Sequence, residues 1–250
     1  MDITVIIPAR YESTRFPGKP LAELKGKPLI QHVYERASEA KLVTRVLVAT
    51  DDRRILDKVK AFGGKACMTS QSHQTGTDRI AELAGEIDSS IIVNVQGDEP
   101  YLEPESIDRT IQPLIDDPDL VMSTVKVKIG DSREIFDVNV VKVVTDRNDF
   151  ALYFSRWPVP FHREKWKSVL EKVYDENLPC PDIFKHLGLY VYRKDFLLAF
   201  SKWPQTPLEK MEKLEQLRVL ENGYRIKVVE SRYDSTGVDT PEDLEKLRNS

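Results

Sequence analysis

The chain has 250 residues, 40% of them hydrophobic, with 37 lysines and arginines against 41 aspartates and glutamates. A formal net charge of -4 lacks the basic excess typical of nucleic-acid-binding proteins, so we expect no nucleic-acid partner. No apolar run approaches the roughly 20 residues that cross a bilayer. The N-terminus also lacks the basic start and apolar stretch of a signal peptide. The composition therefore predicts a cytoplasmic protein without membrane insertion.

The length and the lack of a long linker favour one α/β domain over residues 1–250, although two lobes would also fit. The cysteines are Cys67 and Cys180, far apart in the sequence. They provide too few ligands for a disulfide framework or a thiolate metal site, so we expect reduced cysteines that pack in the interior.

The first half of the sequence alternates apolar runs with helical patterns. Apolar runs over 3–8, 45–50 and 90–96 lack polar alternation, as expected for strands covered on both faces. Helical spacing occupies 28–41 and 51–64 between them. This order predicts a mostly parallel sheet whose ligands bind beyond the carboxyl ends of the strands.

The second half is more varied. Apolar runs also cover 121–129 and 138–144. The stretches 125–129 and 138–144 alternate in polarity, which favours antiparallel or edge strands with one wetter face. Prolines and charges over 155–184 indicate an excursion off the sheet, over the active site or into a partner subunit. Further strands are expected over 185–193 and 224–230.

Two helices are expected near the end of the chain. Residues 207–223 have a proline near the first turn and Gly223 as the stop. Their apolar residues are predicted to form one packed face: Leu208, Met211, Leu214, Leu217 and Val219. Residues 240–248 have a threonine cap and an acidic first turn.

The segment IPARYESTRFPGKPL, residues 7–21, follows the first strand. Arg10, Arg15 and Lys19 flank a glycine and prolines there, so three donors can converge on the oxygens of a nucleoside triphosphate. The segment contains neither GxxxxGK[ST] nor GxGxxG, which argues against a P-loop ATPase and a Rossmann dehydrogenase. The alternative is a solvated surface loop.

Two acidic residues are candidates for binding Mg²⁺. Asp98 follows the strand at 90–96, and Mg²⁺ favours one or two carboxylates together with substrate oxygens. Asp239, far along the chain, is a possible second ligand. The alternatives are an ordinary turn for Asp98 and a position ahead of a helix cap for Asp239.

Other polar residues have a structural and a functional interpretation. TGTDR, residues 75–79, could read a nucleobase edge or cap a helix. His186 could be structural or catalytic. Arg156 and Arg163 could bind a substrate carboxylate or be solvated. The polar residues of the helix at 207–223 have a solvated face as the default interpretation: Glu212, Glu215, Gln216 and Arg218.

The chain closely resembles the 3-deoxy-manno-octulosonate cytidylyltransferases, also called CMP-Kdo synthetases, over nearly its whole length. The resemblance rests on these segments, in order: IPARYESTRFPGKPL, VATDD, TGTDR, NVQGDEP, YFSRWPVP, KHLGLYVYR, PLEKMEKLEQLRVLENG and GVDTPEDL. The LEQLR and HLGLY blocks separate this family from other sugar nucleotidyltransferases.

The resemblance implies that CTP and Kdo give CMP-Kdo and pyrophosphate, with Mg²⁺ required, for lipopolysaccharide assembly. It implies a three-layer α/β sandwich of the nucleotide-diphosphosugar transferase type, with a mixed, mostly parallel sheet. It also implies a homodimer, with residues of about 120–200 serving sugar binding and dimerisation.

The resemblance assigns roles to matching positions. It implies that Arg15, Lys19, Asp98 and Asp239 are catalytic, the two aspartates as the magnesium ligands. The implied nucleotide-binding residues are Arg10, Arg15, Lys19, Thr77, Asp78 and Arg79. The implied sugar-site residues are Gln96, Arg156, His186, Tyr190, Glu215 and Gln216.

Some positions depart from the family pattern. Phe16 stands where leucine is common and Thr75 where serine is usual, and both keep the size class. Trp157 is bulkier than the small residue generally found there, which leaves open an 8-amino variant of Kdo as the substrate. Three further functions stay open: activation of sialic acid, a uridylyltransferase of the same fold, and a non-catalytic nucleotide-binding module.

Overall fold

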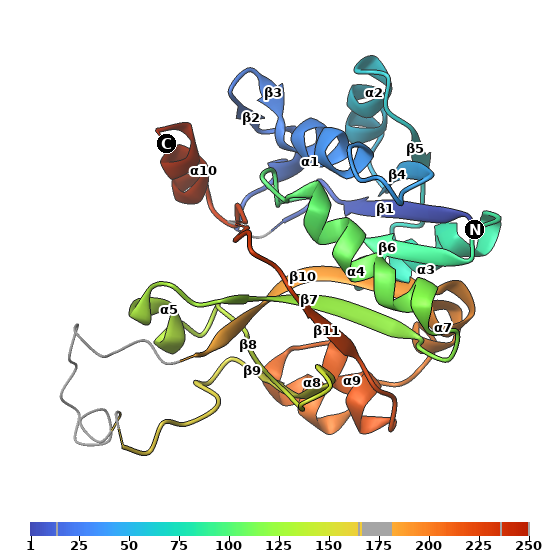
Figure 1. The fold of residues 1–250 in the computed structure, drawn as a ribbon. Coiled ribbons are helices and arrows are strands. Elements are labelled where there is room, and N and C mark those ends of the chain that lie inside the picture. Colours follow the sequence, from blue (N-terminus) through green and yellow to red (C-terminus); the bar gives the residue numbers. More distant parts are fainter. Residues whose placement is uncertain (14, 165, 167–181, 236, 250) are drawn as a thin grey trace.

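The computed structural model describes residues 1–13, 15–164, 166, 182–235 and 237–249. It shows a sheet with helices on both faces (Figure 1). The strands are β1 (Ile3–Ala9), β2 (Glu23–Leu24), β3 (Lys27–Pro28), β4 (Arg45–Thr50), β5 (Ala66–Met68), β6 (Ile91–Asn94), β7 (Met122–Lys128), β8 (Lys142–Thr145), β9 (Ala151–Ser155), β10 (Phe184–Arg193) and β11 (Lys227–Glu230). The helices are α1 (Leu29–Ser38), α2 (Arg53–Ala61), α3 (Gly76–Glu86), α4 (Pro104–Asp116), α5 (Ser132–Phe136), α7 (Lys194–Phe200), α8 (Pro207–Glu212), α9 (Gln216–Glu221), α10 (Pro241–Arg248) and the 3-10 helix η1 (Lys19–Leu21).

The main sheet has the strand order β11-β7-β10-β6-β1-β4-β5. Strands β6, β1, β4 and β5 are parallel, and β10 runs antiparallel to both β6 and β7. Strand β11 is parallel to β7 at the far edge, while β8 pairs antiparallel with β10 and β9. The predicted mixed, mostly parallel sheet is therefore confirmed.

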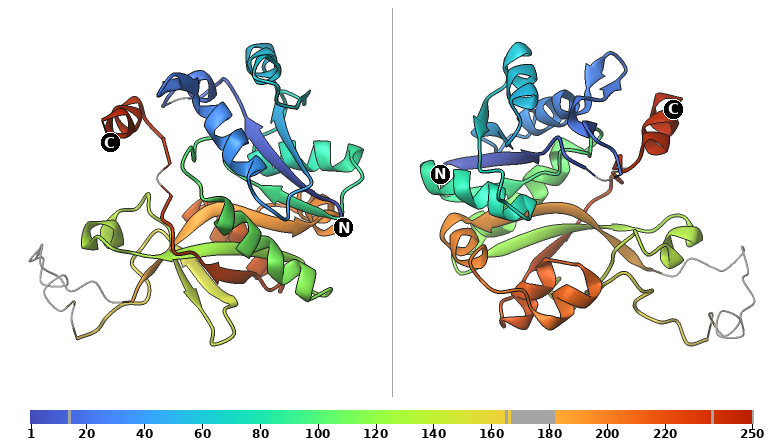
Figure 2. Two further views of the ribbon diagram at one scale, coloured as in Figure 1. Left: turned by 45° about the horizontal axis from the view of Figure 1, so that its top comes forward. Right: turned by 180° about the vertical axis from the view of Figure 1, so that it is seen from behind.

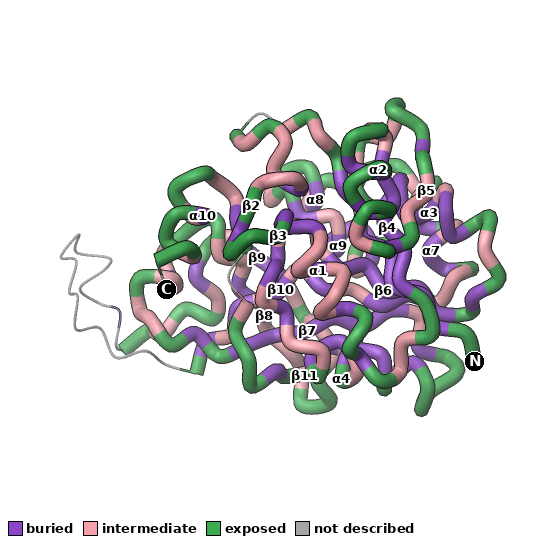
Figure 3. Tube along the Cα trace, turned by 90° about the horizontal axis from the view of Figure 1, so that it is seen from above, coloured by how far each residue is buried: buried purple, intermediate pink, exposed green. Residues whose placement is uncertain are grey.

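The core has one part on each face of the sheet, because successive strand residues point to opposite faces. Val5 and Ile7 of β1 pack with α1, α2 and α4, whereas Ile6 between them packs with α3, α7 and α9. Figures 2 and 3 show the helices on either side and the buried strands between them. This arrangement is the predicted three-layer sandwich.

The C-terminal segment returns to the carboxyl end of β1. Val238 and Leu244 are buried with Leu24 and Leu29 in a small cluster beside the β2–β3 ribbon. Thr240 caps α10 through a capping box with Asp243, as its sequence predicts. This packing brings the residue between Val238 and Thr240 to the edge where β1 and β6 end.

Two strand predictions need correction. Strand β8 begins at Lys142 rather than Val138, and Asp137 ends the short helix α5 just before it. Strand β7 pairs antiparallel with β10, as predicted, but its wetter face is limited to Lys128, since Ser123, Thr124 and Lys126 are buried. Because β7 lies between β10 and β11, both of its edges are paired and its polar side chains bond internally.

The prediction of one continuous helix over 207–223 is wrong. Lys213 adopts a left-handed conformation with φ 55° and separates α8 from α9. The break lets Arg218 reach back to Glu209, where Nη2 lies 2.6 Å from Oε1 and Nε lies 2.8 Å from Oε2. Met211, predicted on the packed face, is 75% exposed as a result.

Other expectations have mixed outcomes. Cys67 is a free, partly buried cysteine on β5, whereas Cys180 lies outside the described residues. Most of the predicted excursion over 155–184 also lies outside them. No helix in the described part of the chain is long and apolar enough to span a membrane.

The buried Arg218–Glu209 pair predicts a large effect on stability. The variant Arg218→Leu leaves the Glu209 carboxylate buried without its partner, so we expect the free energy of unfolding to fall by about 3 kcal/mol or more. Urea unfolding monitored by circular dichroism measures it. The control is Arg53→Ala, whose pair with Asp57 is exposed and contributes little. Equal stability of the two variants would contradict this interpretation.

Candidate active site

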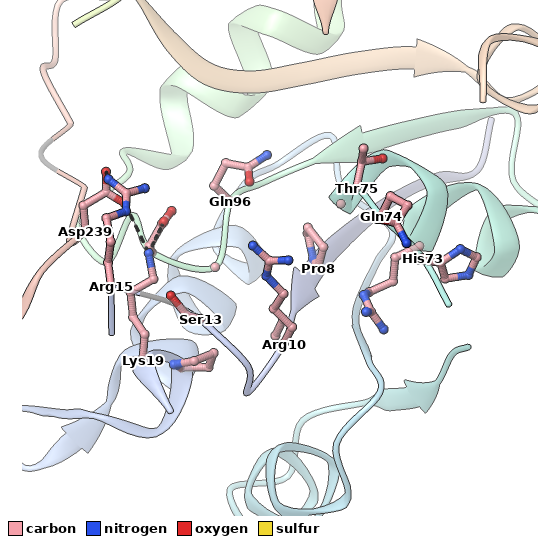
Figure 4. Close-up of a pocket in the computed structure, with 16 residues that line it drawn as sticks. Pro8, Arg10, Ser13, Arg15, Lys19, His73, Gln74, Thr75, Gln96 and Asp239 are labelled. Carbon is pink, nitrogen blue, oxygen red and sulfur yellow. Dashed lines mark hydrogen bonds and ion pairs between the residues drawn. The ribbon is translucent and has the colours of Figure 1, made fainter. Parts of the chain in front are cut away.

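A cavity of about 330 Å³ lies at the carboxyl ends of β1 and β6. Residues from the end of β1 and the loop after it, from the start of α3 with the residues before it, and from the loop after β6 line it together with Asp239, whereas Thr77 and Asp78 do not (Figure 4). Because β1 and β6 are parallel neighbours, the loops that follow them meet at the same edge of the sheet. The cavity is therefore where the sequence predicts a ligand site.

The loop after β1 is closed by a contact between its two ends. The backbone N–H of Gly18 donates to the carbonyl of Tyr11 at 2.9 Å, and Gly18 has φ 72°. A Cβ at Gly18 would lie 3.1 Å from the Tyr11 ring, so glycine serves both the turn and the close approach. The turn places Lys19 at the start of η1, with its side chain in the cavity.

Lys19 joins two acidic residues from distant parts of the chain. Its Nζ lies 2.6 Å from Asp98 Oδ2 and 3.4 Å from Asp239 Oδ1. Arg15 Nη1 lies 3.1 Å from the other oxygen of Asp239. The predicted gathering of these cations and acids around one cavity is what the geometry shows (Figure 4).

The two aspartates form a donor set that fits Mg²⁺. Their carboxylates already converge on a single cationic atom, Lys19 Nζ, at the rim of the cavity. Within the described residues, no group of three or more His, Cys, Asp or Glu side chains could hold a metal alone. Mg²⁺ commonly takes one or two carboxylates and completes its shell with water and substrate phosphates, so a pair of aspartates suffices.

The helix α3 begins at the opposite wall of the cavity. Thr75 caps it, and the Asp78 carboxylate accepts from the Thr75 backbone N–H at 3.2 Å. Asp78 is therefore occupied in capping. Arg79 lines the cavity, but its buried guanidinium also bonds Asp51 and Thr69 at the ends of β4 and β5. These contacts fix the position of Arg79.

A second polar cluster lies beyond the residues that line the cavity. Tyr190 donates its hydroxyl hydrogen bond to Gln216 Oε1 at 3.1 Å, and the His186 ring lies 5.2 Å from the Tyr190 ring. Thr77 donates to Glu215 at 2.5 Å, so the helix at the cavity wall is linked to this cluster. Of the predicted sugar-site residues, only Gln96 lines the cavity itself.

Arg156 lies apart from this cluster. Its guanidinium donates to the backbone carbonyls of Glu212 at 2.7 Å and Val138 at 2.9 Å. The carbonyl of Arg156 in turn accepts from the buried Lys142 Nζ at 2.6 Å. Arg156 thus ties the end of β9 to α8 and to the segment before β8.

Burial shifts the pKa values of several groups near the site. It raises the pKa of Glu99 to about 7, with Asp98 adding repulsion, and it also raises the pKa of Glu215. Burial lowers the pKa of His186 to about 3. His186 is therefore neutral at physiological pH. Its Nε2 forms a hydrogen bond with Thr124 Oγ1 at 2.9 Å.

The sequence analysis did not identify some of the residues that line the cavity. His73 and Gln74 line the cavity, and the imidazole of His73 pairs with Glu82 of α3. Their signal was present in the sequence, since they directly precede the TGTDR segment. Ser13 also lines the cavity and lies within the predicted phosphate loop.

The fold and the cavity are those of a nucleotidyltransferase, and the comparison with family models agrees. The cytidylyltransferase family model matches residues 4–238. A solved 4-diphosphocytidyl-2C-methyl-D-erythritol synthase from Anaerococcus prevotii has a TM-score of 0.62 at 15% identity and covers 99% of this chain and 95% of its own. That likeness shows the shared fold.

Closer relatives narrow the class. The chain is 58% identical to a 3-deoxy-manno-octulosonate cytidylyltransferase from Geobacter metallireducens, over 99% of this chain and 96% of the relative. It is 59% identical to one from Geotalea uraniireducens, over 99% and 98%. A solved CMP:2-keto-3-deoxy-manno-octonic acid synthetase complexed with CTP has a TM-score of 0.90 at 42% identity, covering 100% of this chain and 98% of its own. The chain belongs to the family of 3-deoxy-manno-octulosonate cytidylyltransferases.

Proposed function

We propose that the protein is a cytoplasmic enzyme that transfers CMP from CTP to the anomeric hydroxyl of Kdo, releasing pyrophosphate, and so supplies CMP-Kdo for lipopolysaccharide assembly. The observation that carries the proposal is the convergence of Lys19, Asp98 and Asp239 on one cavity. It occurs in a chain more than half identical, over nearly its full length, to curated enzymes named for this activity.

The loop after β1 binds the triphosphate in this proposal. Arg10, Arg15 and Lys19 come from one short segment that lines the cavity, so their charges can surround the phosphate oxygens. The anomeric oxygen of Kdo bonds to the α-phosphorus in line as the bond from that phosphorus to pyrophosphate breaks. The hydroxyl proton passes to water, and pyrophosphate leaves toward these cations. No covalent enzyme intermediate is needed, because catalysis rests on position and charge neutralisation.

Asp98 and Asp239 hold Mg²⁺ in this proposal. When bound, the metal would neutralise negative charge on the phosphate oxygens of CTP. Lys19 and Arg15 already contact these carboxylates and would keep them oriented toward the nucleotide. Arg79 is held beside the cavity for the cytosine, while Thr77 and Asp78 support that wall from within α3.

The sugar occupies the side of the cavity nearest Gln96 and the cluster behind it. Gln216 Nε2 is buried and has no hydrogen-bond partner among the described residues, so a donor is available there for a sugar oxygen. Tyr190 donates to the oxygen of this amide, His186 packs against the Tyr190 ring, and Glu215 accepts from Thr77. Arg156 bonds backbone carbonyls through Nε and Nη1, so in this proposal it serves the carboxylate of Kdo with its remaining N–H groups.

The identity of the product tests the function directly. We expect the purified protein with CTP and Mg²⁺ to convert Kdo to a CMP-sugar with the mass of CMP-Kdo, releasing pyrophosphate. Parallel reactions with 8-amino Kdo, sialic acid and UTP define the substrate. Tight CTP binding without any product would favour a non-catalytic module instead.

The charged cluster of Lys19, Asp98 and Asp239 predicts how much activity is lost when one of these side chains is replaced. We expect Lys19→Met to lower kcat about a hundredfold or more, because an oriented donor to a developing charge is worth that much. Asp98→Asn and Asp239→Asn should need more Mg²⁺ for half-maximal rate. Lys27→Met is the matched control, since Lys27 pairs with Glu35 on the surface. Near-normal rates for all three site variants at low magnesium would contradict the assignment.

We propose that two copies of the chain form a homodimer through the region of β9 and α8. Exposed apolar side chains gather on segments that Arg156 ties together: Val138 is 55% exposed, Trp157 69% and Met211 75%. Leu152 of β9 adds another at 62%. Contiguous exposed apolar side chains are typical of protein interfaces.

A charge in this region should separate the subunits. We expect Met211→Lys to give the mass of a monomer by light scattering, at a concentration at which the unaltered protein has the mass of a dimer. Met68→Lys is the control, because Met68 is also exposed but lies on β5 at the opposite edge of the sheet. A monomeric mass for the unaltered protein would refute the homodimer.

A further inference from the structure

Three chain segments meet directly behind the two aspartates. The first is the loop after β6, which includes Asp98. The second is the segment between β11 and α10, which includes Asp239, and its Val238 N–H donates to the Asp98 carbonyl at 2.9 Å. The third is β10, whose pairing with β7 shifts register between Leu187 and Tyr190. The distance between the two aspartates depends on how these segments are joined.

Glu99 contacts all three segments. It follows Asp98 directly and is only 9% exposed. Ser235 Oγ, from the segment before α10, donates to Glu99 Oε2 at 3.1 Å. The other carboxylate oxygen, Oε1, lies against Gly188 in the irregular part of β10, where an added Cβ would be 3.5 Å from it. One buried side chain thus contacts both of the other segments.

The packing around Glu99 leaves little freedom. A Cβ at Gly188 would lie 3.5 Å from Glu99 Oε1 and 3.1 Å from Gln96 Cγ, so β10 lies directly against the loop after β6. On the other side, Lys185 of β10 pairs with Asp234 at 2.7 Å, next to Ser235. These contacts hold the segment before α10 against the start of β10.

Glu99 does not belong to the cavity lining formed by the described residues. A direct contact with CTP is therefore not what its position offers. Its carboxylate instead lies against Ser235 and Gly188, on the two segments that meet the loop of Asp98. This placement suits a residue that acts through others.

We propose that Glu99 is a positioning residue, which holds the loop of Asp98 and the segment of Asp239 in register so that both aspartates face one cavity. The inference rests on the proposed function for its catalytic consequence. Buried groups that orient ligating carboxylates typically change activity or metal affinity by about ten- to a hundredfold when removed.

The chemistry of the two links predicts which substitutions are tolerated. In Glu99→Gln, the side chain keeps its size against Gly188, and its amide NH₂ can donate to the Ser235 hydroxyl, which also accepts. Glu99→Ala removes both the contact with Gly188 and the bond to Ser235. Ser235→Ala removes one link and covers the case in which Glu99→Ala does not fold. Glu103→Ala is the control, because Glu103 pairs with Arg36 on the surface.

Two measurements test the proposal. Amide hydrogen exchange at Val238, without ligands, reports whether the two segments remain joined. The Mg²⁺ concentration for half-maximal rate, compared with KM for CTP, reports whether the aspartates remain aligned. For Glu99→Ala we expect faster exchange at Val238 and about a tenfold or larger rise in the Mg²⁺ requirement. We expect a smaller loss for Ser235→Ala and values near those of the unaltered protein for Glu99→Gln and Glu103→Ala.

The outcomes are distinguishable. If Glu99→Gln loses activity as fully as Glu99→Ala while exchange at Val238 stays slow, the charge of Glu99 matters and the positioning role is refuted. Unchanged exchange and Mg²⁺ requirement in Glu99→Ala would refute it as well. If the unaltered protein forms no CMP-sugar, the proposed function fails, but exchange at Val238 still decides whether Glu99 joins the segments.

Discussion

The ion pairs of Lys19 with Asp98 and Asp239 are the constraint on which the site depends. Like charges on two carboxylates repel, so they remain close only where a cation lies between them. Lys19 provides that charge from the loop after β1. The parallel pairing of β1 and β6 brings Lys19 and Asp98 together, and the packing of α10 against the β2–β3 ribbon brings Asp239 to them.

The rest of the fold can be understood as support for this meeting point. The alternating faces of the strands give two separate cores, so helices can cover both sides while the strand ends stay open. The turn at Gly18 directs Lys19 inward, and the contacts of Arg79 with Asp51 and Thr69 fix the opposite wall. The cavity is therefore bounded by elements that are held independently of any ligand.

The sequence predicted the parallel half of the sheet well, because strands such as β1 and β4 are apolar along their length and have a clear signal. It also predicted where Asp98 would lie, since the end of a buried strand fixes that position. Bringing Asp239 to the same place depends on long-range topology that local patterns do not encode: the sequence offered Asp239 as a possible second ligand, and the family resemblance paired it with Asp98. The break between α8 and α9 was missed for a related reason: Arg218 pairs with Glu209 only once both are buried.

The anchoring of Arg156 changes how variants at this position should be interpreted. Its side chain and carbonyl connect β9, α8 and the segment before β8 through backbone atoms of Glu212 and Val138 and the ammonium of Lys142. A truncated side chain would lose the bonds to the carbonyls of Glu212 and Val138, next to the exposed apolar side chains of that region, while the backbone bonds of Arg156 remain. Lost turnover in such a variant would therefore have two possible causes, the loss of a substrate contact and the loss of these structural hydrogen bonds. A crystal structure of the variant separates the two.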